Sequence, residues 1–295
     1  MNYVFKADEQ TIARIVNSFD RECFTDGVPY TRYAIRYDSC NINIYTSNKV
    51  MFQGENARIY AATFFGLEAV EAQENKEDKP ANTFPQAGSD EVGTGDYFGP
   101  ICVCACYIDD AVYRKIKHLN LIDSKQLSDR DILAMGEELI RNVPHSLLIL
   151  NNEKYNTVHK NANLNKIKAL MHNKAYCNLR KKGIKLPEKI IIDQFCEERT
   201  YYRYLTDEKE VIRNITFETK AENKYVSVAC GALISRYAFL KEMEAMGEKY
   251  HLTFPKGAGK QVDEFIKTFV RKYSVSELEK VAKTDYKNTE KALGE

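Results

Sequence analysis

The sequence GSDEVGTGDYFGP, residues 88–100, places two acidic residues at the end of an expected strand, with three glycines following them. Side chains alternate between the two faces of a strand, so Asp90 and Glu91 point to opposite sides. A carboxylate that faces a protein core costs several kcal/mol unless it is paired or binds a metal. Glycine lets the backbone turn sharply or approach a ligand closely. The stretch predicts a functional strand end, with a polar hairpin carrying surface acids as the alternative.

Two further acids lie at the ends of other expected elements. Asp193 ends the apolar run Ile190–Ile192, and Glu222 precedes a long apolar helix. Strand ends open at the edge of an α/β sheet, where active-site groups commonly lie. The alternatives are a helix N-cap or surface acid for Asp193, and a charge that complements the helix dipole for Glu222.

Carboxylates from separate elements are typical ligands of hard divalent cations. Mg²⁺ accepts a few of them and keeps several waters. Two such ions about 4 Å apart can activate a water and stabilise the leaving oxygen in phosphodiester cleavage. The water is then the nucleophile, so this chemistry requires none of the five histidines as a base.

The pattern of apolar residues predicts two parts joined by a linker. Residues 1–75 are typical of a small α+β module with the order helix, three strands, helix, and residues 76–87 have linker composition. Residues 88–295 show an α/β pattern. We expect strands there at 88–91, 101–108, 146–150, 189–193 and 211–217, and helices at 110–118, 128–142, 163–181, 225–246, 260–272 and 275–293.

Composition sets broad limits on function. The 295 residues suffice for one large domain or two ordinary ones, and the net charge of +1 leaves the class of partner open. The N-terminus lacks the apolar core of a signal peptide and no apolar run is long enough to span a membrane, which predicts a cytoplasmic protein. Eight cysteines form no CxxC pair, and the alternation of Cys102, Cys104 and Cys106 predicts buried reduced thiols, with a metal cluster as the alternative.

Short stretches in order along the chain resemble the ribonuclease HIII family, bacterial relatives of ribonuclease HII. The first is residues 88–100. The others are residues 123–128 (DSKQLS), 163–165 (NLN), 168–173 (KALMHN), 192–195 (IDQF), 219–222 (TKAE), 254–258 (FPKGA) and 287–293 (KNTEKAL). Residues 50–54 (VMFQG) extend the resemblance into the N-terminal module.

The resemblance implies an α/β fold with a ribonuclease H-like mixed sheet flanked by helices. A small α+β domain similar to half of a TATA-binding protein would precede it and hold the substrate. The implied catalytic and metal-binding residues are Asp90, Glu91, Asp193 and Glu222, with Mg²⁺ or Mn²⁺ as the cofactor and two ions in the substrate complex. Glutamate in the last place favours type HIII, because type HII has aspartate there.

The implied activity is hydrolysis of the RNA strand of RNA–DNA hybrids, which leaves 5′-phosphate and 3′-hydroxyl ends. We expect a monomer that requires no protein partner. Thr94 stands where type HII has the arginine of Gly-Arg-Gly, which favours long hybrids over single ribonucleotides embedded in DNA. Two other hypotheses stay open: a type HII-like enzyme that cuts such ribonucleotides, and a non-catalytic nucleic-acid-binding protein. Four carboxylates repel phosphate when no metal is present, which argues against the second.

Substrate contacts are expected in three places. The backbone of Gly93, Thr94 and Gly95 can approach the 2′-hydroxyl, the group that distinguishes RNA from DNA. Phosphate or hydroxyl contacts are expected from Ser124 and Lys125, and a phosphate contact from the charge of Lys256. In the N-terminal module the residues expected to line one face of the strands are Arg32, Arg36, Asn43 and Tyr45. The alternative for each group is an ordinary solvated loop or sheet face.

Overall fold

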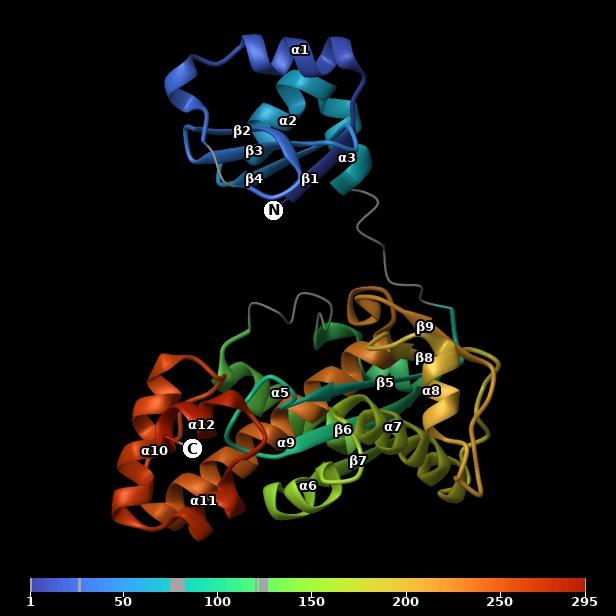
Figure 1. Ribbon diagram of the computed structural model, residues 1–295. Helices are drawn as coiled ribbons and strands as arrows, with labels where there is room; N and C mark the ends of the chain where they lie inside the picture. The colour runs from blue at the N-terminus through green and yellow to red at the C-terminus, as the bar shows by residue number, and fades with distance from the viewer. Residues whose placement is uncertain (1, 26–27, 75–82, 120, 122–126, 295) are drawn as a thin grey trace. The chain divides into compact units, whose positions relative to one another are not determined.

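The computed structural model describes residues 2–25, 28–74, 83–119, 121 and 127–294. It divides into two compact units, Met1–Lys79 and Pro80–Glu295 (Figure 1). Within the described ranges, no helix combines the length and the apolar character needed to cross a membrane.

The N-terminal unit is built on a four-stranded antiparallel sheet in the order β1-β4-β3-β2. The strands are β1 (Asn2–Lys6), β2 (Thr31–Tyr37), β3 (Cys40–Tyr45) and β4 (Lys49–Gly54), and the helices are α1 (Glu9–Asn17), η1 (Arg21–Cys23), α2 (Ala57–Phe65) and α3 (Leu67–Glu74). Alternate strand residues such as Ile42, Ile44 and Phe52 are fully buried in a core shared with the helices. The intervening residues form an open face, which is the more polar side of the sheet.

The expected order of this unit, helix, three strands, helix, was incomplete because β1 precedes the first helix. Strand β1 is short, and its three consecutive apolar residues hide the alternation that marks a strand. Its partner is β4, with Val4 opposite Met51, so the strand depends on a pairing with residues far along the chain. A second closing helix, α3, also follows α2 directly.

The second unit contains a five-stranded mixed sheet in the order β7-β6-β5-β8-β9. The strands are β5 (Gln86–Val92), β6 (Ile101–Ile108), β7 (His145–Leu150), β8 (Ile190–Asp193) and β9 (Ile215–Glu218). The pairs β5–β6 and β6–β7 are antiparallel, whereas β5–β8 and β8–β9 are parallel. The carboxyl ends of β5, β8 and β9 therefore lie at the same edge. The α/β architecture expected for this region is confirmed.

Helices cover both faces of this sheet, with α9 (Val226–Tyr250) on one side and α7 (Leu164–Lys181) on the other (Figure 1). The residues of β6 alternate between the two cores: Val103 packs with α7 and Cys104 with α9. All eight cysteines lie within the described residues and are free thiols. The alternating cysteines are thus buried packing residues.

Two glycines let α9 lie close to the sheet. A Cβ atom on Gly88 would stand 2.5 Å from the backbone nitrogen of Val228, and one on Gly231 would stand 2.7 Å from the carbonyl oxygen of Cys104. Any side chain at either position would push α9 away. The close approach places the start of α9 directly beside the strand that carries Asp90.

The remaining helices pack around these layers. They are α4 (Asp110–Ile116), η2 (Lys117–Leu119), α5 (Asp129–Asn142), α6 (Asn152–His159), α8 (Glu198–Tyr204), η4 (Ala221–Asn223), α10 (Lys260–Lys272), α11 (Val275–Val281) and α12 (Lys287–Leu293). The helices α6 and α8 were not expected. The expected strand 211–217 is reduced to β9, which follows a left-handed Asn214. The expected helix 275–293 is two helices, because Ala282 between them pairs with Phe98.

Candidate active site

The fold brings the four predicted acids to one edge of the sheet. Asp90 and Glu91 lie near the carboxyl end of β5, and Asp193 ends β8. The parallel register places Ser89 opposite Ile192, so Asp90 and Asp193 occupy the next positions of neighbouring strands. The Ala221 N–H donates to Oδ1 of Asp193 at 2.8 Å, which brings η4 and its Glu222 to the same edge.

The two adjacent acids of β5 face opposite sides of the sheet. Asp90 shares a face with Gly88, the residue that contacts α9, while Glu91 shares a face with Ser89 and points toward α7. Asp193, through its bond to η4, lies on the α9 side together with Asp90. One face of the strand end therefore carries Asp90, Asp193 and Glu222, and the other carries Glu91.

Asp90 lies in strongly unfavourable surroundings for a negative charge. Burial, and then the charges of Glu91, Asp193 and Glu222, raise the pKa of Asp90 well above its ordinary value. The Glu91 N–H, which donates to Oδ1 of Asp90 at 2.7 Å, only partly offsets this. A divalent cation would remove the repulsion, and an all-oxygen donor set suits Mg²⁺ or Mn²⁺.

The side chains as they stand are not yet arranged around an ion. Among the described residues, no three His, Cys, Asp or Glu side chains converge in a geometry that would hold one metal. Glu91 points to the α7 side, where its two oxygens contact Lys168 and His172. The chemistry of the donor set fits a divalent cation.

Glu91 is held by a buried network that the sequence analysis did not assign to the site. Nε2 of His172 lies 2.8 Å from Oε2 of Glu91, and Nζ of Lys168 contacts Oε1. On the other side of the imidazole, Nδ1 lies 2.7 Å from Oγ of Ser89. Although burial raises it, these contacts bring the pKa of Glu91 below its ordinary value. The available signal was the spacing of Lys168 and His172, which puts both on one face of a helix.

The glycine-rich turn after β5 is anchored by the C-terminal part of the chain. Gly93 has a φ of +96°, and a Cβ there would stand 2.1 Å from the carbonyl oxygen of Pro100. Tyr286 donates its hydroxyl to the carbonyl of Thr94 at 2.5 Å. The Gly257 N–H donates to Oδ1 of Asp96 at 2.6 Å. The conformation of the turn is thus determined by segments more than 150 residues away in sequence.

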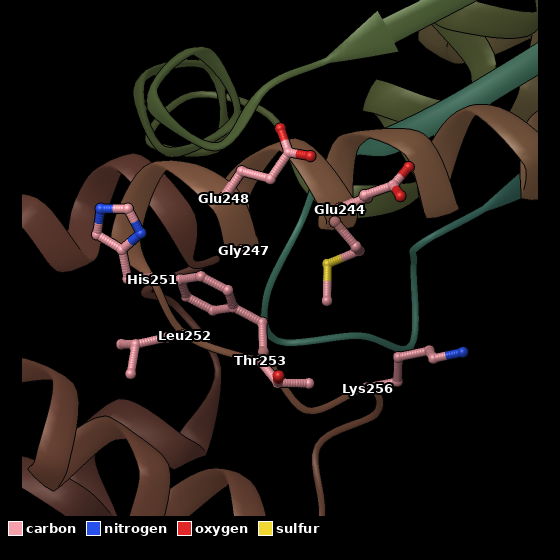
Figure 2. A pocket seen from close by; sticks show the side chains of 9 residues that line it. Glu244, Gly247, Glu248, His251, Leu252, Thr253 and Lys256 are labelled. Carbon is pink, nitrogen blue, oxygen red and sulfur yellow. The ribbon is translucent and has the colours of Figure 1, made fainter.

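The other predicted contact residues differ in their availability. Ser124 and Lys125 lie outside the described residues. Nζ of Lys256 contacts Asp129, which also pairs with Arg236 at 3.3 Å. Lys256 lines an open groove of about 650 Å³ beside the second half of α9 (Figure 2). Glu244, Glu248 and His251 line the same groove, so Lys256 shares it with two acids and a histidine.

In the N-terminal unit the four predicted residues fall into two groups. Arg36, Asn43 and Tyr45 lie on the open face of the sheet, since Ile35, Ile42 and Ile44 face the core. Arg32 forms a bidentate ion pair with Glu9, at 2.7 and 2.9 Å. The guanidinium of Arg32 is therefore already occupied within the protein, whereas Arg36 donates from Nε to Asn41 at 3.1 Å.

Comparison with known proteins places this arrangement in a family. The Ribonuclease HII family model matches residues 87–289, and Domain of unknown function (DUF3378) matches residues 2–77. Ribonuclease HIII of Listeria monocytogenes is 39% identical over 301 residues, which cover 99% of this chain and 98% of the relative. The chain belongs to the ribonuclease HIII family. Ribonuclease HIII of Bacillus pumilus is 37% identical, with 98% and 97% covered.

Solved structures agree with the ribonuclease HIII assignment. The crystal structure of Bst-RNase HIII in complex with Mn²⁺ is 37% identical, covers 100% of this chain and 98% of its own, and has a TM-score of 0.69. RNase H3 of Aquifex aeolicus, at 23% identity and a TM-score of 0.56, shares the fold. The resemblance stated from the sequence is confirmed, as are the ribonuclease H-like mixed sheet and the small N-terminal domain. Ribonuclease HIII proteins are endonucleases of the ribonuclease H family, and this chain is a member.

Proposed function

We propose that this ribonuclease HIII hydrolyses the RNA strand of RNA–DNA hybrids with the help of Mg²⁺ or Mn²⁺. The observation that carries the proposal is the partly buried cluster of Asp90, Glu91, Asp193 and Glu222 at one sheet edge, where burial and then the neighbouring acids raise the pKa of Asp90. Such a cluster is unfavourable for folding alone and favourable once a cation binds. The Mn²⁺ complex of Bst-RNase HIII supports the same conclusion.

In the proposed site Asp90 and Asp193 are the main metal ligands, and Glu91 and Glu222 complete the coordination of the ions. We expect two ions in the substrate complex, which would supply a water activated at neutral pH and charge stabilisation for the leaving 3′-oxygen. Asp90 and Asp193 are suited to their part because neighbouring parallel strands hold their backbones rigidly. The expected products carry 5′-phosphate and 3′-hydroxyl ends.

Recognition of the ribose is assigned to the glycine-rich turn. Gly95 is exposed, and no described atom lies within 4 Å of a Cβ built on it, so a sugar can approach its backbone. The bond from Tyr286 to the Thr94 carbonyl holds the turn in place before substrate arrives. Backbone donors from a preorganised turn can read the 2′-hydroxyl, which DNA lacks. Thr94 in place of arginine favours long hybrids as the substrate.

The open face of the N-terminal sheet is proposed to hold the hybrid, through Arg36, Asn43 and Tyr45, with Arg32 less available because of Glu9. Lys256 is proposed as a phosphate contact, which it would make by exchanging its pairing with Asp129. Ser124 and Lys125 remain proposed contacts on the basis of sequence. We expect the protein to act as a monomer in the cytoplasm.

The test is cleavage of a long RNA–DNA hybrid labelled on the RNA strand, with and without Mg²⁺ or Mn²⁺. Parallel reactions contain a DNA duplex with one embedded ribonucleotide, and the same duplexes without ribonucleotides. We expect metal-dependent cleavage of the long hybrid, slow cleavage of the single ribonucleotide, and products that ligase can join through their 5′-phosphates. Preferred cleavage of the single ribonucleotide would favour a type HII-like enzyme. Tight hybrid binding without cleavage in either metal would favour a non-catalytic protein.

A further inference from the structure

The buried side of α7 carries three polar residues, of which Asn173 bonds to the backbone at Glu210 and Ile212 while Lys168 and His172 point to the strand end of β5. Lys168 is 8% exposed and His172 is fully buried, and both are spaced to lie on one face of the helix. Burying such groups costs free energy unless each finds a hydrogen-bonding partner. Both find the same partner, the carboxylate of Glu91.

The imidazole of His172 connects two side chains of the same strand. Ser89 and Glu91 are two residues apart on β5 and therefore face the same way. Nδ1 lies 2.7 Å from the Ser89 hydroxyl and Nε2 lies 2.8 Å from Oε2 of Glu91. With a neutral ring, Ser89 donates to Nδ1 and Nε2–H donates to the carboxylate. The direction of the ring, and thereby that of the carboxylate, is fixed from both ends.

An aromatic ring from the segment after β8 supports this network. Phe195 follows Asp193 by two residues, and its ring stacks on the imidazole of His172 at 5.4 Å between centroids. Nζ of Lys168 lies 4.1 Å from the centroid of the same ring. One side chain from the segment after β8 thus limits the movement of both groups that hold Glu91.

We propose that His172, backed by Ser89 and Phe195, is a positioning residue that orients Glu91 as a metal ligand, while Lys168 balances its charge. This inference rests on the proposed function. Glu91 lies on the opposite face of β5 from the other three acids. Whether it can bind the same metal site therefore depends on the orientation of its carboxylate. An ionised carboxylate has about four acceptor sites, and the two bonds to α7 leave acceptor capacity for a cation. Removing such a supporting partner typically lowers metal affinity about 10–100-fold.

The test measures binding of Mn²⁺ alone to the full chain, with free Mn²⁺ followed by electron paramagnetic resonance. His172→Phe keeps the ring volume and the packing on Phe195 but removes the donor, whereas His172→Gln restores a donor. We expect an affinity about 10–100-fold weaker for His172→Phe and recovery of most of the loss in His172→Gln. Native circular dichroism and a cooperative unfolding transition would show that the fold persists.

Unchanged or tighter Mn²⁺ binding by a folded His172→Phe would overturn the inference. If His172→Phe fails to fold, Ser89→Ala serves instead, because it removes only the hydroxyl behind the ring, and an affinity equal to wild type would again overturn it. Asp90→Asn separates this inference from the proposed function. If Asp90→Asn binds Mn²⁺ as tightly as wild type, the proposed metal site is wrong. If Asp90→Asn binds Mn²⁺ more weakly than wild type but His172→Phe binds it as tightly, the metal site stands and only the positioning role of His172 is wrong.

Discussion

The buried ammonium group of Lys283 donates a hydrogen bond to the backbone carbonyl of Asp96, with 2.8 Å between nitrogen and oxygen. It donates a second to the carbonyl of Gly99 at 2.5 Å. Lys283 lies between α11 and α12, and both acceptors belong to the glycine-rich turn that follows the acids. One side chain from the C-terminal part of the chain therefore holds the segment that directly follows the residues proposed to contact ribose.

Replacing Lys283 by methionine should loosen this turn. The side chain keeps its volume but leaves buried carbonyls without a charged donor, which costs about 1.5–3 kcal/mol in the free energy of unfolding. We also expect a higher KM for hybrid, by about tenfold if 1.4 kcal/mol of substrate contact is lost. Urea unfolding and steady-state kinetics measure the two effects.

The control is Lys280→Met, which removes an exposed lysine paired with Glu277. Exposed pairs contribute about 0.2–1 kcal/mol, so both measurements should stay close to wild type. Equal KM values for Lys283→Met and Lys280→Met would show that the turn does not depend on Lys283.

The same lysine makes stability depend on pH. Burial lowers the pKa of Lys283 to about 8, from an ordinary value of 10.5. Between these values the unfolded chain holds a proton that the folded chain has released, so the free energy of unfolding rises with pH over this window. The difference between wild type and Lys283→Met should therefore grow in favour of wild type from pH 8 to pH 10. A difference that is constant across this range would contradict the burial of a charged Lys283.

Asp90→Asn should make the free energy of unfolding nearly independent of Mg²⁺. In the metal-free chain the substitution removes a buried negative charge that three other acids repel, so we expect a higher free energy of unfolding than in wild type. Mg²⁺ at 100 times its Kd should add about 2.7 kcal/mol to wild type and little to the variant. Turnover should fall about a thousandfold or more, since several kcal/mol of charge stabilisation are lost.

Chemical unfolding with and without Mg²⁺ measures the effect of Asp90→Asn on stability, and hybrid cleavage measures its effect on turnover. Asp207→Asn, an exposed position, is the matched control and should behave as wild type in both. Normal turnover by Asp90→Asn would refute the assignment of the site.

Arg36 and Arg32 should differ in their importance for hybrid binding. Arg36 lies on the open sheet face, whereas Arg32 is held by Glu9. Arg36→Ala should weaken binding of a long hybrid and lower the slope of log K against log salt by about 1. Arg32→Ala should change this slope less. Fluorescence anisotropy at several salt concentrations gives both slopes, and equal slopes for the two variants would argue against the open face as the binding surface.

Much of the fold follows from local sequence patterns. The apolar run before Asp193 forms β8, and the helix expected at 163–181 is α7, which begins after its N-cap Asn163. Apolar alternation and N-cap chemistry act over a few residues, so they can be read without knowing the rest of the chain. The same holds for the stretches on which the family resemblance was based.

The sequence by itself determined which acids to consider and the chemistry they share. Only the tertiary structure decided how they meet. The parallel pairing of β5 with β8 brings Asp193 beside Asp90, and a bond from η4 to Asp193 brings Glu222. The support of Glu91 by His172 and of the glycine-rich turn by Lys283 spans 81 and 187 residues. Contacts over such distances arise from packing and strand pairing, which leave no local periodicity in the sequence.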